Sequence, residues 1–169
     1  MAREVMGNID LDPASNEQAN KHFVKASRYY YVAGLETRWF GRIFMNPPYN
    51  KIGNQSGAGV WLTKLLHEYD SGHIEEAMAL TKSVPSYNWW DDLYHRDWHG
   101  STCLTKGLIQ FVHLSWINED GTITVPKGRS NKSKSASTFW YVGPHANRFK
   151  RIFSNVGMVI SHSDRKDLE

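Results

Sequence analysis

The chain has 169 residues, of which 40% are hydrophobic and 22% are charged, and its formal net charge is +3. Seven Trp, eight Tyr and seven Phe supply far more apolar surface than disordered proteins carry, which predicts a folded protein of ordinary domain size. The lone Cys103 excludes an internal disulfide framework, and apolar runs of about five or six residues are too short to cross a membrane. Without a basic and apolar leader sequence, we expect a single cytoplasmic domain over residues 1–169.

Short apolar segments alternate with segments of helical periodicity along the chain. The segments expected to form strands are 8–12, 28–32, 42–45, 76–81, 101–114, 138–142 and 158–160, and those expected to form helices are 16–26, 60–69, 87–98 and 146–153. This alternation is typical of an α/β sheet with helices on both faces. Ligands of such sheets bind beyond the carboxyl ends of the strands. Residues 10–15 and 46–49 are therefore the loops expected to carry function.

The tetrapeptide Asn46-Pro47-Pro48-Tyr49 follows a hydrophobic strand and suits one task well, which is to hold a planar amine. The two prolines fix the backbone and remove two N–H donors, while Asn46 adds a side-chain acceptor. Two acceptors match the two hydrogens of an amino group. The Tyr49 ring offers a face on which an unpaired base stacks, with a stabilisation of about 1–3 kcal/mol. A Pro-Pro pair is also a common way to end a strand, so the tetrapeptide alone leaves both readings open.

The sequence resembles the small, Dam-like DNA N6-adenine methyltransferases of bacteriophages and prophages. The resemblance covers most of the chain, and its motifs agree in order and spacing. They are residues 9–16 (IDLDPASN), 29–30, 34–35, 39, 41–49 (GRIFMNPPY), 61, 106–111 (KGLIQF, similar to a basic strand of the family), 137–143 (STFWYVG) and 149–159. Ala33 and Leu108 depart from the family pattern, which usually has an acidic residue and an arginine at these positions. By this resemblance, residues 2–6 are expected to be the tail of a helix that the family precedes with a Thr-Pro-containing segment, which helps to enclose the cofactor, so we expect an abbreviated amino end.

This resemblance implies a Rossmann-like methyltransferase fold and S-adenosylmethionine as the cofactor. Asp12 is the expected partner of the cofactor's ammonium group, and Asp10 is a second candidate. The full set of cofactor-binding residues that the resemblance implies is Asp10, Asp12, Pro13, Ala14, Ser15 and Asn46. Asp followed by Pro is also a common start of a helix, a role compatible with cofactor binding.

The implied reaction is direct methyl transfer to the N6 amine of an adenine that has left the duplex, and it needs no metal. Asn46 and the Pro47 carbonyl are expected to accept the amine's hydrogens, and Tyr49 to stack the base. DNA is the implied partner, contacted through its phosphates by basic residues. The candidates are Lys106 and four residues of a Gly/Ser/Asn-rich loop expected to be flexible over 126–136, namely Lys127, Arg129, Lys132 and Lys134. A solvated surface loop is the competing interpretation of that segment.

Three other functions fit parts of the sequence. The same tetrapeptide serves methyltransferases that act on glutamine side chains of proteins, and a shortened amino end fits a DNA-binding remnant of the fold without catalysis. His95 and His99, four residues apart, suggest a metal hydrolase, although one such pair is more often a surface feature. Trp89 and Trp90 are adjacent, and both are candidates to line a base pocket. Adjacent aromatic residues on a helix point in different directions, so we expect one of them to pack in the core.

Overall fold

The computed structural model describes residues 1–118, 120–129, 133 and 135–161. Its strands are β1 (Leu11–Asp12), β2 (Arg28–Tyr29), β3 (Gly41–Met45), β4 (Ile74–Lys82), β5 (Ser101–Thr105), β6 (Ser137–Val142) and β7 (Gly157–Ile160). Its helices are α1 (Ala2–Met6), α2 (Glu17–Ala19), α3 (Gly57–Asp70), α4 (Asn88–Asp92) and α5 (Ala146–Phe153), with π turns η1 (Asn20–Val24) and η2 (Leu93–Asp97) and a 3-10 turn η3 (Leu114–Trp116).

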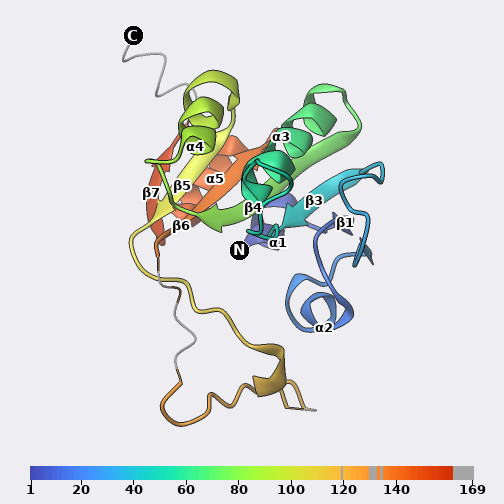
Figure 1. The fold of residues 1–169 in the computed structure, drawn as a ribbon, viewed down its shortest axis with the longest axis vertical. Coiled ribbons are helices and arrows are strands. Elements are labelled where there is room, and N and C mark those ends of the chain that lie inside the picture. Colours follow the sequence, from blue (N-terminus) through green and yellow to red (C-terminus); the bar gives the residue numbers. More distant parts are fainter. Residues whose placement is uncertain (119, 130–132, 134, 162–169) are drawn as a thin grey trace.

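The seven strands form one mixed sheet in the order β2-β1-β3-β4-β6-β5-β7 (Figure 1). Strands β1 to β4 are mutually parallel, whereas β6 runs antiparallel to both β4 and β5, and β7 runs antiparallel to β5. The order reverses between β1 and β3, since the chain proceeds outward from β1 to β2 and then returns to the other side. Such a reversal is the point at which open α/β sheets bind ligands.

Helices pack on both faces of this sheet because successive residues of a strand point to opposite sides. Ile43, Met45 and Ala77 face α3 and the α4/η2 segment, which contribute Trp61, Leu62, Leu65, Leu66, Trp90 and Leu93 to one buried cluster. The opposite face carries Met78, Cys103 and Tyr141, packed against Val5, Met6, Phe149 and Phe153 of α1 and α5. The α/β architecture with helices on both faces thus agrees with the alternation in the sequence, and Cys103 is a buried core residue.

Several elements differ from their expected bounds. The helix expected over 16–26 is divided into α2 and η1 and ends where Lys25 takes a left-handed φ of 53°. Of the segment 101–114, which was expected to be rich in strand, only Ser101–Thr105 forms a strand. Residues 106–111 lie beyond it and are not the basic strand implied by the resemblance. Residues 87–98 form α4 followed by a π turn. Helix α5 has the predicted bounds.

The carboxyl ends of β1, β3, β4 and β5 lie along one edge of the sheet, because these four strands run in the same direction. Strand β6 runs the other way and therefore begins at that edge, where Ser137 pairs with Lys82 at the end of β4. We call this the carboxyl edge. Residues 106–136, which we call the arm, leave the sheet after β5 and return at β6, so both ends of the arm lie on the carboxyl edge (Figure 1).

Candidate functional site at the carboxyl edge

Asp12 ends β1 as a buried carboxylate with 3% of its surface exposed. Burial raises its pKa to about 6, although the Ala14 backbone N–H, 3.1 Å from Oδ1, and the Ser15 side chain favour the charged form. Within the described part of the chain, no Lys, Arg or His forms an ion pair with Asp12. A buried carboxylate without a basic partner is a favourable place for a cationic ligand group, because burial strengthens the attraction between opposite charges.

The loop that follows Asp12 is held by β2 and by Gly34. The Ser15 N–H donates to the Tyr30 carbonyl at 3.0 Å, so the loop continues the pairing of the two strands. A Cβ on Gly34 would lie 2.0 Å from the Pro13 carbonyl oxygen and 2.8 Å from the Trp61 ring. Only glycine fits this contact, so Gly34 and Trp61 fix the position of the loop that follows Asp12.

Asp10, the second cofactor candidate, is engaged elsewhere. Its Oδ2 accepts hydrogen bonds from the backbone N–H and from Nε of Arg42, each at 2.9 Å. Burial opposes the ionisation of Asp10, but the hydrogen bonds and charge of Arg42 outweigh it and lower the pKa. Arg42 is the second residue of β3 and also donates to the Met6 carbonyl at 3.2 Å. Asp10 therefore ties β1, β3 and α1 together at the end of β3 remote from Asn46.

The Asn46–Tyr49 loop begins where β3 ends. Pro47 is buried, whereas Asn46, Pro48 and Tyr49 are exposed. The loop rests on the first turn of α3, because a Cβ on Gly57 would lie 2.9 Å from the Pro48 carbonyl oxygen and 2.1 Å from that of Asn50. Among the residues that the structure describes, no donor reaches the Pro47 carbonyl, so this oxygen is free to accept a ligand's hydrogen. Asn46 and Pro47 thus present acceptors on the strand next to Asp12.

Tyr49 contacts two polar groups of the edge. Its hydroxyl donates to Asn46 Oδ1 at 3.2 Å, and the Lys82 amino group lies 4.8 Å from the centre of its ring. Although 37% of Tyr49 is exposed, its partial burial raises the pKa of Tyr49 to about 12, so the hydroxyl remains a donor at neutral pH.

Lys82 was not among the residues singled out from the sequence. It is the last residue of a buried strand, and the rule that ligands bind beyond carboxyl ends would have indicated it.

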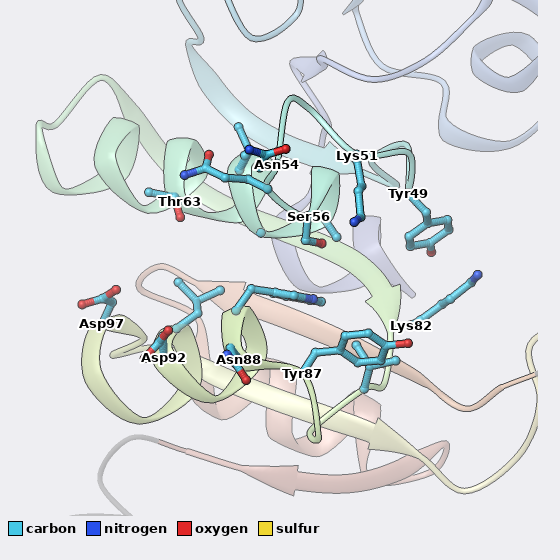
Figure 2. A pocket seen from close by; sticks show the side chains of 17 residues that line it. Tyr49, Lys51, Asn54, Ser56, Thr63, Lys82, Tyr87, Asn88, Asp92 and Asp97 are labelled. Carbon is cyan, nitrogen blue, oxygen red and sulfur yellow. The ribbon is translucent and has the colours of Figure 1, made fainter.

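A cavity of about 890 Å³ opens beside Tyr49, between α3 and the α4/η2 segment (Figure 2). Tyr49, Lys82 and Tyr87 lie at one end of it, and Asp92 and Asp97 lie at the other. The cavity adjoins the Asn46–Tyr49 loop through Tyr49 and does not include the loop after Asp12. The Asn46–Tyr49 loop therefore borders this cavity, and it follows the strand that pairs with the strand of the buried Asp12 carboxylate.

Trp89 lines this cavity and lies close to Gly59, on which a Cβ would approach the Trp89 Cβ to 3.2 Å. Trp90 is 4% exposed and packs edge-on against Trp140, with ring centres 4.6 Å apart. The expectation that one of the two adjacent tryptophans packs in the core is confirmed, and Trp90 is that residue.

The basic candidates lie on the arm. Lys106, Lys127 and Arg129 are exposed, and none of these three forms an ion pair with another described residue. Lys132 and Lys134 lie outside the described residues. Residues 126–129 form a turn in which the Arg129 N–H donates to the Pro126 carbonyl at 3.0 Å.

The two histidines that suggested a metal hydrolase do not converge. His95 contacts Asp91 at 3.6 Å, whereas His99 lies beyond the end of η2 and contacts Asp70 at 3.2 Å. Across the described residues, no group of three or more His, Cys, Asp or Glu side chains is arranged to hold a metal ion. None of the described helices has the length and apolar character needed to span a membrane.

Comparison with protein-family models, curated proteins and solved structures finds no match for this chain. Its function is therefore inferred from the arrangement of residues at the carboxyl edge.

Proposed function

We propose that the protein is a DNA adenine N6-methyltransferase that uses S-adenosylmethionine. The observation that carries this proposal is the placement of two loops on neighbouring parallel strands. Leu11 of β1 pairs with Ile43 of β3, so the buried carboxylate of Asp12 and the acceptors of Asn46 and Pro47 meet at the same edge. They meet at the reversal of strand order, where α/β sheets bind ligands.

The cofactor's ammonium group fits Asp12. Its positive charge would supply the partner that this buried carboxylate lacks among the described residues, and it would lower the pKa of Asp12 from about 6. The backbone of Pro13 to Ser15, fixed by Gly34 and Tyr30, would lie alongside the bound molecule. When bound, S-adenosylmethionine supplies a methyl group activated by a positively charged sulfur.

Asn46 and Pro47 orient the amine that receives the methyl group. The Asn46 Oδ1 and the Pro47 carbonyl each accept one amino hydrogen, which directs the nitrogen lone pair out of the plane of the base. Nitrogen becomes positively charged as it reacts, and the same two oxygens stabilise that charge. The nitrogen then loses one proton to solvent and becomes a neutral secondary amine.

The base itself is held by stacking and enclosure. The Tyr49 ring is 37% exposed and lies at the mouth of the 890 Å³ cavity, where an extruded purine finds both a stacking surface and space. Taking adenine out of a duplex costs a few kcal/mol, and stacking on an aromatic ring returns about 1–3 kcal/mol of this. Lys106, Lys127 and Arg129 form no ion pair with another described residue, and these exposed cations favour DNA over a protein glutamine as the substrate.

The test is transfer of labelled methyl from S-adenosylmethionine to unmethylated DNA, followed by separation of the nucleosides. We expect label in N6-methyladenosine and a loss of at least about 100-fold in Asn46→Ala, since that variant lacks an acceptor that stabilises developing charge. Asn50→Ala is the matched control, because Asn50 is an exposed asparagine of the same loop. Label in protein glutamine, or tight DNA binding without any transfer, would replace the proposal with one of the two alternatives. Full activity of Asn46→Ala would refute the assigned role.

A further inference from the structure

The arm leaves the sheet and returns to it beside the proposed site. It joins β5 to β6, which are antiparallel neighbours, and the Ser83 N–H after β4 donates to the Ala136 carbonyl at 2.9 Å where the arm returns. Along the arm, the Ser133 N–H donates to the Ile109 carbonyl at 2.7 Å, and Ile117 and Ile123 form an antiparallel bridge. The described residues of the outgoing and returning parts of the arm therefore contact each other at these two places.

The arm also reaches across the carboxyl edge. Figure 1 shows it extending away from β5 and β6 beneath the sheet, with its far end toward α2. A Cβ on Gly121 in its turn would lie 4.0 Å from Nδ1 of His22, which belongs to η1 between β1 and β2. The arm thus runs from the β5/β6 side of the sheet to the β1/β2 side, past the ends of β3 and β4.

The surface of the arm combines apolar and basic side chains. Four apolar residues are between 37% and 49% exposed, a high fraction for such side chains, namely Leu108, Phe111, Ile123 and Val125. Lys106, Lys127 and Arg129 are exposed on the same segment. By sequence the arm carries five Lys or Arg against two acidic residues, a formal charge of +3. This equals the net charge of the whole chain, so the remaining residues, with fifteen of each sign, are neutral.

We propose that the arm binds a DNA duplex against the carboxyl edge. Its phosphates are contacted by Lys106, Lys127 and Arg129, and the bases around the extruded adenine are contacted by Leu108, Phe111, Ile123 and Val125. This inference rests on the proposed function. Apolar side chains contact thymine methyl groups in the major groove, and they also insert between unstacked bases. The concentration of the chain's excess positive charge on the arm matches the charge of a polyanion.

The test is binding of a fluorescent 30-base-pair duplex of mixed sequence, measured by anisotropy between 50 and 200 mM salt, conditions over which phosphate contacts are strongly screened. For Lys127→Ala/Arg129→Ala, we expect the slope of log Kd against log salt to fall by about 2, since each lost phosphate contact removes about 0.9. For Ile123→Ser/Val125→Ser, we expect affinity to fall roughly tenfold with an unchanged slope, because base contacts are not screened.

Lys150→Ala/Arg151→Ala is the control for charge, since it removes two exposed basic residues of α5. Met158→Ser is the control for an exposed apolar residue outside the arm. Equal changes of slope in both charge variants, or unchanged affinity in the Ile123/Val125 variant and in Leu108→Ser, would overturn the proposal.

Methyl transfer, measured separately, distinguishes the two proposals. Arm-dependent DNA binding without transfer of label would contradict the proposed function and support the arm's role. Transfer to adenine that is unchanged in all the arm variants would support the function and overturn the inference about the arm.

Discussion

The amino group of Lys82 lies 4.8 Å from the centre of the Tyr49 ring, although the two residues are 33 positions apart in the chain. Tyr49 in turn donates its hydroxyl to Asn46 at 3.2 Å. Both the ring and the Asn46 acceptor therefore have partners within the protein, and an entering adenine must exchange them. This exchange requires little free energy, because an exposed cation–π contact contributes about 0.5–1 kcal/mol and a hydrogen bond contributes about 1 kcal/mol net.

Tyr49 is expected to act mainly through its ring. Tyr49→Phe keeps the stacking face and removes only the hydrogen bond to Asn46, so we expect methyl transfer to fall less than about tenfold. Tyr49→Ala removes the face, and loss of about 1–3 kcal/mol of stacking corresponds to a decrease of roughly 5- to 150-fold. Steady-state kinetics on unmethylated DNA would measure both. Tyr87→Ala, which removes another tyrosine of the same cavity, is the control. Equal losses in the Phe and Ala variants would show that the hydroxyl matters more than the ring.

The two carboxylates of the first strand segment are expected to separate cofactor binding from stability. Asp12→Asn should weaken S-adenosylmethionine binding at least about tenfold, because it removes the charge that faces the ammonium group. Asp10→Asn should leave cofactor binding near that of the wild type and lower the free energy of unfolding by about 1–3 kcal/mol, since Arg42 loses a charged partner. Calorimetry and denaturant unfolding measure the two effects. The reverse pattern would transfer the cofactor role to Asp10.

The raised pKa of Asp12 predicts a dependence of stability on pH. Its carboxyl has a pKa of about 6 when folded against 3.8 in the reference state, so the folded protein binds more protons between these values. The resulting stabilisation is fully present below pH 3.8 and is lost as pH rises through about 6, a change of about 3 kcal/mol.

Asp12→Asn removes this contribution. The unfolding free energy of Asp12→Asn minus that of the wild type should therefore increase between pH 4 and pH 7 by about 2–3 kcal/mol. Urea unfolding at several pH values measures it. If the difference in unfolding free energy between Asp12→Asn and the wild type does not change with pH, the pKa of Asp12 is not raised by burial in the folded protein. Saturating S-adenosylmethionine is expected to reduce the pH dependence of the wild type, because the ammonium group stabilises the ionised form.

Gly34 is expected to be irreplaceable even by alanine. A Cβ at this position would overlap the Pro13 carbonyl oxygen at 2.0 Å, so Gly34→Ala must displace the loop that follows Asp12. We expect a loss of stability of about 1–3 kcal/mol, as for other overpacked sites, together with weaker cofactor binding. Gly107→Ala is the control, since no atom lies within 4 Å of its added Cβ. A Gly34→Ala protein that binds the cofactor normally would separate this loop from the cofactor site.

The sequence by itself determined the alternation of elements. Apolar periodicity predicted α5 with its observed bounds and the cores of β3, β4 and β6, because buried faces impose a repeat that is readable without a structure. It also identified the Asn46–Tyr49 loop, since two prolines that follow a strand are a local signal. The short strands β1 and β2 were overestimated, because two-residue pairings depend on neighbouring strands more than on their own residues.

Only the tertiary structure decided which residues work together. Asp10 and Asp12 are both candidates in the sequence, yet Asp10 is paired with Arg42 and Asp12 is buried without a cation among the described residues. Lys82 contacts Tyr49 because β4 ends beside the Asn46–Tyr49 loop. Both ends of the arm lie at the carboxyl edge because β5 and β6 are antiparallel neighbours. Such relationships follow from strand order and direction, which are set by the packing of distant segments and leave no local pattern in the chain.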